Sequence, residues 1–194
     1  PISKVELSAL GAYKFSTTTQ AHEIRDYSNQ AWAFRAMDDA TMRDANPWLY
    51  TDPDNANSLP VSVLPVGGFY RETKYSMNSY DFRSTISYND VYNDDHIVNF
   101  FGGMEINSVD RKRTWFNGVG MQYDMGMLPS YDYLYFKQGN EEGSDYYTVS
   151  ETRSRSASFF GNINYSYQGK YSLNGTMRYE GTNKLGKSRS ARWL

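Results

Sequence analysis

A strict alternation near the end of the chain constrains its fold more than any other feature. Between residues 157 and 167, every second residue is apolar, aromatic or small, and most residues between them are polar. The first set consists of Phe159, Gly161, Ile163, Tyr165 and Tyr167. A period of two places alternate side chains on opposite faces of a β-strand. The pattern therefore predicts a strand with one apolar face and one polar face.

A second strand of the same kind follows at once. Residues 168–170 predict a short turn, and the alternation then resumes over residues 171–180. The apolar set of this second strand is Tyr171, Leu173, Gly175, Met177 and Tyr179. Aromatic residues gather at the turn end of both segments, as they do in the interfacial girdle of a membrane barrel. The two segments predict an antiparallel hairpin.

An upstream hairpin is expected from the same pattern. Residues 82–88 and residues 98–106 both alternate, and residues 89–95 between them are rich in turn formers. The first of these strands extends back towards Phe69.

A third hairpin is expected at the start of the chain. Residues 5–15 alternate well, and Ser16 with the three threonines after it predicts a turn. The partner strand would be residues 23–34, although residues 31–42 are also compatible with a short helix.

The connections between the predicted hairpins are long and polar, at residues 36–66 and 108–155. Outer-membrane barrels alternate short periplasmic turns with long external loops in this way. The even-numbered strands would then run outward. We therefore expect an all-β fold, an antiparallel up-and-down transmembrane β-barrel, of which this chain supplies about six strands with long extracellular loops.

About six strands of this kind cannot close around a wide lumen, and an open sheet in hydrocarbon would leave unpaired edges. Further strands are therefore expected on both sides. The sequence opens at Pro1 with neither an initiator Met nor a signal peptide, and it closes at Leu194 without a stopping feature. We interpret residues 1–194 as a fragment of one barrel domain.

Composition excludes several other classes. A net charge of −2 gives no basic field for nucleic acid. The chain has no cysteine, hence no disulfide framework and no thiolate metal site. The sequence contains no run of about 18 apolar residues, so no transmembrane helix is predicted. The mean hydropathy of −0.72 still fits a barrel, because polar residues facing the lumen dilute the average.

The C-terminal third also resembles a known family. The stretches FGNINYSY at residues 160–167, GKYSL at residues 169–173 and RYEGTNKLG at residues 178–186 are similar to the mid-barrel signature of the SusC/RagA family of TonB-dependent outer-membrane transporters. The resemblance covers residues 60–194 well and the first 60 residues weakly.

The resemblance implies a location in the bacterial outer membrane and a 22-strand barrel filled by an N-terminal plug. It also implies a complex with a SusD-like lipoprotein and the import of oligosaccharides or oligopeptides, powered by TonB. The plug and the TonB box are absent from this sequence, so no residue is assigned the TonB contact. No cofactor is expected.

Five aromatic residues in the expected external loops are candidates for substrate binding: Trp48, Tyr50, Tyr131, Tyr133 and Tyr135. Aromatic faces stack on sugars, and Tyr also suits peptides because it is both polar and apolar. The commoner alternative is packing of loop on loop or against the lipoprotein lid.

Five residues are expected to face lipid: Phe159, Ile163, Tyr165, Leu173 and Met177. The charged run at residues 110–113 lies just past an outward strand, where it would meet lipopolysaccharide head groups or form a solvated loop base.

Metal and catalytic sites find little support. Residues 52–57 are similar in composition to a calcium-binding loop. However, Ala56 occupies a ligand position and no Glu follows at the required spacing, which favours a solvated turn. His22 and His96 lack a second His at metal spacing, so hydrogen bonding is favoured for His96. No nucleophile elbow or paired-carboxylate motif appears, so an enzyme is not expected.

Two other classes of protein fit the sequence less well. A secreted β-sandwich that binds glycans would need turns about every 8 to 12 residues, which the long loops fit badly. A surface adhesin or passive porin shares the barrel physics but not the family signature.

Overall fold

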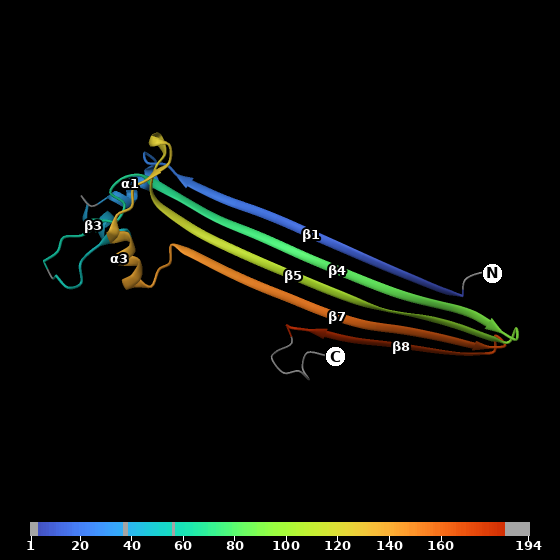
Figure 1. Ribbon diagram of the computed structural model, residues 1–194. Helices are drawn as coiled ribbons and strands as arrows, with labels where there is room; N and C mark the ends of the chain where they lie inside the picture. Colours follow the sequence, from blue (N-terminus) through green and yellow to red (C-terminus); the bar gives the residue numbers. More distant parts are fainter. Residues whose placement is uncertain (1–3, 37–38, 56, 185–194) are drawn as a thin grey trace. The chain divides into compact units, whose positions relative to one another are not determined.

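The computed structural model describes residues 4–36, 39–55 and 57–184 of the chain (Figure 1). These residues form mostly antiparallel β-sheet. The main sheet has six strands: five long strands in the order β1-β4-β5-β7-β8, and the short β6, Leu128–Pro129, which pairs with β5 alone. Of the long strands, β1 and β8 are the outermost. The strands are β1 Val5–Ile24, β4 Gly68–Tyr92, β5 His96–Gln122, β7 Tyr147–Tyr167 and β8 Tyr171–Thr182.

The chain divides into two compact units, which are described separately. Among the described residues, unit 1 consists of residues 4–16, 76–112 and 151–184, and unit 2 of residues 17–75 and 113–150. Unit 1 contains the two tight turns and all of β8. Unit 2 contains the helices and the long connections.

The two hairpins of unit 1 confirm the sequence prediction. Tight turns join β4 to β5 and β7 to β8, and the central residues have positive φ: 49° at Asn93, 56° at Asp94, 52° at Gln168 and 64° at Gly169. Positive φ at both central positions gives a twist that matches the strands on either side. β4 also begins at Gly68, as the expected extension to Phe69 requires.

The register of β7 on β8 brings like residues opposite one another. Phe159 pairs with Tyr179, Gly161 with Met177, Ile163 with Gly175 and Tyr165 with Leu173. Directly opposite residues share a face of the sheet. The apolar sets of the two strands therefore lie together on one face, and Asn162, Asn174 and Thr176 lie on the other.

The prediction of a hairpin at the start of the chain is wrong. β1 runs without a break through residues 16–19, because three consecutive threonines are β-branched and favour extended backbone. The expected partner strand is instead helix α1, Asn29–Arg35, followed by α2, Ala40–Asp44. Ser28 starts α1 by accepting a hydrogen bond from the Ala31 N–H at 3.2 Å. The main sheet therefore has five long strands. β1 begins in unit 1, which contains the tight turns, and ends in unit 2, which contains the long connections.

The predicted loop at residues 108–155 is also too long. β5 continues to Gln122 and β7 begins at Tyr147, so residues 123–146 alone connect them. Charged side chains in the missed parts pair across the strands, as Asp110 does with Arg155 at 2.8 Å. This pairing suits a strand as well as a loop.

Unit 2 has its own small core. Ile24, Ala31, Leu64, Phe69 and Val119 are buried in one cluster. The connection after β1 contains the short pair β2 Leu49–Tyr50 and β3 Val61–Ser62. The connection after β5 contains η1 Tyr123–Met125, β6 Leu128–Pro129 and α3 Tyr133–Glu142. Asp132 caps the start of α3, and Gly143 with φ 69° ends it. No helix among the described residues has the length and apolarity to cross a bilayer.

Candidate functional site

The polar face of the sheet in unit 1 is a continuous hydrogen-bonded surface. Glu105 on β5 lies 3.4 Å from the Arg83 guanidinium of β4 and 4.0 Å from that of Arg178 on β8. The Ser158 hydroxyl of β7 donates to the same carboxylate at 3.5 Å. These contacts place side chains of four neighbouring strands on one face.

The amides of this polar face are also paired with one another. The Asn162 Nδ2 group donates to the Thr176 hydroxyl at 2.9 Å and to Asn174 Oδ1 at 3.3 Å. Arg178 pairs in addition with Glu180 at 3.1 Å. A polar, hydrogen-bonded sheet face of this kind is typical of a surface in contact with water, such as the interior of a membrane barrel.

The opposite face carries the five residues predicted to face lipid. Phe159, Ile163, Leu173 and Met177 lie there with large exposed surfaces, 68% for Leu173 and 70% for Met177. Tyr165 is half-buried, and its hydroxyl lies 2.7 Å from Nδ1 of His96. A contiguous exposed apolar surface of this kind marks a contact with lipid or with another protein.

At the strand tilt usual in membrane barrels, the apolar face would have about the height of their apolar band. From Ala157 to Tyr167, the β7 residues of this face are apolar, aromatic or small. Ten residue steps at about 3.3 Å along a strand tilted by about 40° correspond to about 25 Å. We call this surface the apolar band. Tyrosines at its turn end, Tyr165, Tyr167 and Tyr171 among them, form an aromatic edge.

Three of the five predicted substrate-binding aromatics in unit 2 are engaged in packing. The Trp48 ring meets Phe34 and Phe69 edge-on, with ring centroids 5.2 and 4.9 Å apart, and it stacks on Tyr135 at 6.1 Å. The Tyr135 hydroxyl accepts from Asn117 Nδ2 at 3.2 Å, and burial raises the pKa of Tyr135. Trp48 and Tyr135 therefore hold the two long connections together.

Tyr50 is the third packed aromatic, with 7% of its surface exposed. Its hydroxyl donates to Glu141 at 3.2 Å, and the Lys137 ammonium lies 5.1 Å from its ring centre. The hydroxyl of Tyr50, followed by the Asp52 and Glu141 carboxylates, raises the pKa of Lys137. This cluster keeps α3 against β2.

Tyr131 and Tyr133 remain accessible. Tyr133 is 74% exposed, and the Tyr131 ring lies 5.9 Å from that of Phe136. A hollow of ≈ 430 Å³ lies beside Phe136. It is lined by Tyr135, Phe136, Gly139, Asn140, Ser144, Asp145, Tyr146 and Tyr147.

The hollow beside α3 combines aromatic walls with polar groups. Phe136 meets Tyr135 and Tyr146 edge-on at 5.4 and 5.1 Å. Asn140, Ser144 and Asp145 supply hydrogen-bonding groups. Mixed surfaces of this kind suit peptides and sugars. Sequence reasoning missed Phe136 and Tyr146, because the helix that brings them together appeared to be a featureless loop.

The other marked positions have local roles. Asp52 accepts from the Asp54 N–H at 3.2 Å, and its carboxylate lies 3.6 Å from Lys137. The neighbouring Ala56 lies outside the described residues. His96 lies against Tyr165 and Tyr167, with ring centroids 6.0 and 4.9 Å apart. Within the described ranges, no group of three or more His, Cys, Asp or Glu side chains could hold a metal ion.

Comparison with solved structures identifies a similar fold. A structure of the RagAB peptide transporter matches with a TM-score of 0.63 and 17% identity, covering 100% of this chain and 17% of that chain. The RagAB peptide importer in its closed-closed state matches with a TM-score of 0.64 and 16% identity, with the same coverage. No family model and no curated protein matches the sequence. The chain thus has the fold of a small part of a much longer transporter chain.

Proposed function

We propose that this chain forms part of the wall and the external loops of a TonB-dependent outer-membrane importer of the SusC/RagA kind. The apolar band carries this proposal. It is exposed on one face of the sheet in unit 1, while the reverse face is hydrogen-bonded and polar. A soluble sheet would bury such a face under a second layer, and none of the described residues of unit 1 covers it.

The importer takes up oligopeptides or oligosaccharides together with a SusD-like lipoprotein and performs no chemistry of its own. The fold of the RagAB peptide transporter supports oligopeptides as the first cargo to test. The accessible Tyr131 and Tyr133 are the best placed of the predicted binding residues, since Trp48, Tyr50 and Tyr135 have packing roles. The alternative of a secreted β-sandwich needs a second large sheet, but the second sheet among the described residues is only the pair β2–β3, with two residues in each strand.

The membrane part of the proposal is tested by two neighbouring substitutions in the full protein in its native bacterium. Leu173→Arg places a charge in the middle of the apolar band, at a cost of about 2–4 kcal/mol in a bilayer. Asn174→Arg places the same charge on the polar face. We expect the first variant to be lost from the outer-membrane fraction and the second to remain. Equal retention of both variants would contradict a lipid-facing band.

The transport part needs a separate measurement. Deletion of the gene should abolish uptake of isotopically labelled peptides or oligosaccharides, and the wild-type gene should restore it. Mass spectrometry of material that co-purifies with the complex would identify the cargo and the lipoprotein. Unchanged uptake of both substrate classes, with no bound lipoprotein, would refute the importer.

A further inference from the structure

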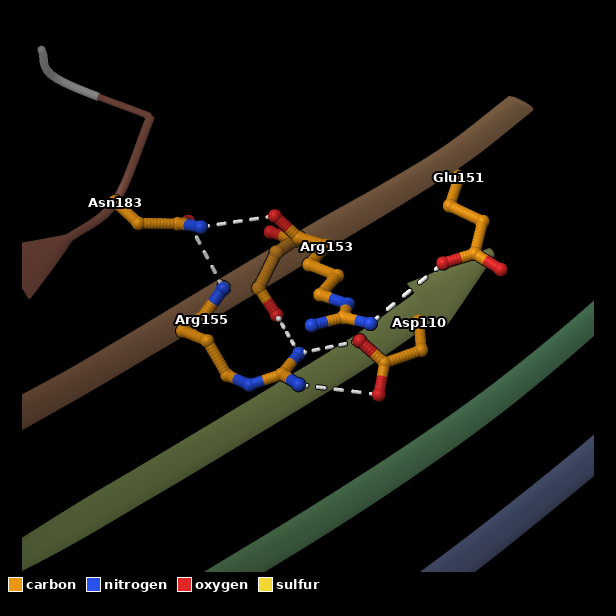
Figure 2. A network of polar contacts seen from close by, with 6 residues as sticks. Asp110, Glu151, Arg153, Arg155 and Asn183 are labelled. Atoms are coloured by element: carbon orange, nitrogen blue, oxygen red, sulfur yellow. Dashed lines mark hydrogen bonds and ion pairs between the residues drawn. The ribbon is translucent and has the colours of Figure 1, made fainter. Parts of the chain in front are cut away.

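A charged network lies on the apolar face of unit 1, directly beyond the apolar band. Figure 2 shows four of its side chains, Asp110, Glu151, Arg153 and Arg155. Arg153 and Arg155 lie an even number of residues from Phe159 along β7, so they share its face. The Arg155 guanidinium donates two hydrogen bonds to the Asp110 carboxylate of β5, at 2.8 and 3.0 Å. Asp110 therefore lies on the same face.

The network contains more cations than carboxylates. Glu151 lies 3.5 Å from the Lys112 ammonium and 3.6 Å from the Arg153 guanidinium, so one carboxylate serves two cations. Asp110 serves Arg155. The Arg153 side chain is 70% exposed. Three cations against two anions leave an excess positive charge at the edge of an apolar surface.

The backbone beneath these cations is held in place. The Asn183 side chain accepts from the Arg155 N–H at 2.9 Å and donates to the Arg153 carbonyl oxygen at 2.8 Å (Figure 2). Arg155 also donates to the Ser154 carbonyl oxygen at 3.2 Å. The arginines are thus presented by a fixed strand edge, which reduces the entropy lost when they bind a ligand.

Three hollows follow one another down this face. The first, of ≈ 210 Å³, lies within the network and is also lined by Ser76 and Asn78. The second, of ≈ 330 Å³, lies below Arg155 and is lined by Ile106, Ala157 and Gly181 among others.

The third hollow, of ≈ 380 Å³, lies within the apolar band between Phe100, Ile163 and Met177, where Gly161 and Gly175 leave room. The order from charged to apolar follows that of a lipid, from head group to acyl chain.

We propose that this surface binds lipopolysaccharide of the outer leaflet. Lys112, Arg153 and Arg155 bind a phosphate of its head group, and an acyl chain lies in the two apolar grooves. Arg binds phosphate through paired, charge-assisted hydrogen bonds. The grooves favour a lipid over a free phosphate, because only a lipid fills both parts of the site. This inference rests on the proposed function, which makes the loop side of the band the outer side.

The head-group half of the site is tested with the full protein purified in detergent. Bound lipopolysaccharide is measured by mass spectrometry of its hydroxylated fatty acids. The double variant Lys112→Gln with Arg153→Gln should retain about a hundredfold less, since it removes two charge-assisted hydrogen bonds and each contributes about one factor of ten. Arg178→Gln, a cation of the polar face, is the matched control and should retain the wild-type amount. Equal retention in all three proteins would overturn the proposal.

The acyl-chain half is tested with Gly161→Leu. A Cβ at Gly161 meets nothing within 4 Å, so the groove has room for a side chain to begin at this position. The variant should lose bound lipopolysaccharide, and excess inorganic phosphate should not displace the lipid from the wild type. Displacement by phosphate together with normal binding by Gly161→Leu would identify a simple phosphate site and reject the lipid.

The result is separable from that of the proposed function. If Leu173→Arg and Asn174→Arg localise as expected, but the double variant retains as much lipopolysaccharide as the wild type, this inference alone fails. If the wild-type protein is absent from the outer-membrane fraction, the proposed function and this inference both fail.

Discussion

Gly120 lies near the end of β5 with φ 76°, where β6 approaches. The Ser130 N–H donates to the Gly120 carbonyl oxygen at 2.9 Å, and a Cβ at Gly120 would collide with the Ser130 carbonyl oxygen. Only glycine satisfies both the backbone conformation and the close approach. This single position therefore fixes how the second long connection leaves the sheet.

We expect Gly120→Ala to lower the free energy of unfolding by clearly more than about 1 kcal/mol. Gly126→Ala is the control, since Gly126 has the same φ of 76° but nothing within 4 Å of its Cβ. The control should cost about 1 kcal/mol, from the backbone conformation alone. Urea denaturation of the folded protein in detergent would measure both, and equal losses would contradict the role given to Ser130.

The environment of Tyr123 predicts that the stability of unit 2 depends on pH. Its hydroxyl donates to the Phe69 carbonyl oxygen at 2.6 Å, and burial, followed by the charges of Glu23 and Asp26, raises the pKa of Tyr123 to about 12. The pKa of an unfolded Tyr is about 10. The unfolded chain therefore loses its proton first, so the stability from this group is complete below pH 10 and declines as the pH rises to about 12.

Tyr123→Phe should flatten this decline. The melting temperature of the variant should fall less between pH 10 and pH 12 than that of the wild type. Burial also raises the pKa of Tyr135, so part of the decline should persist. Identical slopes in the two proteins would contradict the assignment.

At the scale of elements, the hairpin β7–β8 could be predicted from sequence because two signals coincide there. The alternation is strict on both strands, and Gly169 marks a turn that needs positive φ. β1 was missed beyond Phe15 because Ser and Thr serve in turns as well as in strands. The ends of β5 and β7 were missed for a related reason. Their charged residues pair with neighbouring strands, so no apolar face reveals the period.

The loop site could be predicted only in part. The pattern of aromatics identified Trp48 and Tyr135, but the stacking of the two rings joins residues far apart in the chain. Nothing local distinguishes such a packed ring from the exposed Tyr133. Burial depends on the tertiary fold, and single-sequence patterns do not contain it.

The turn between β7 and β8 gives a prediction at this scale. A β-branched residue is strained at the φ of 64° that Gly169 adopts. Gly169→Ile should therefore destabilise the hairpin by about 1–2 kcal/mol and slow its insertion into lipid vesicles. Lys170→Ile, one residue on, should have little effect. The rate of acquiring protease resistance would compare the two variants, and equal rates would speak against a turn-controlled hairpin.

At the scale of the whole molecule, the sheet has two outer strands, β1 and β8, which have no strand beyond them among the described residues. Their unpaired backbone groups are unfavourable in hydrocarbon and invite pairing with other chains. The exposed apolar band adds to this tendency.

The 194-residue chain expressed alone should therefore need detergent and should form mixed oligomers. The same residues within the complete barrel that we propose should give one species. Light scattering coupled to size-exclusion chromatography would measure the masses. A single folded monomer of 22.4 kDa in plain buffer would count against the barrel.

The two tight turns have a further consequence. Each leaves only a few residues outside its strands, centred on Asn93–Asp94 and Gln168–Gly169. A protein that approaches these turns meets few side chains outside the strands. The two hairpins therefore form an end of unit 1 with little surface for another protein to bind.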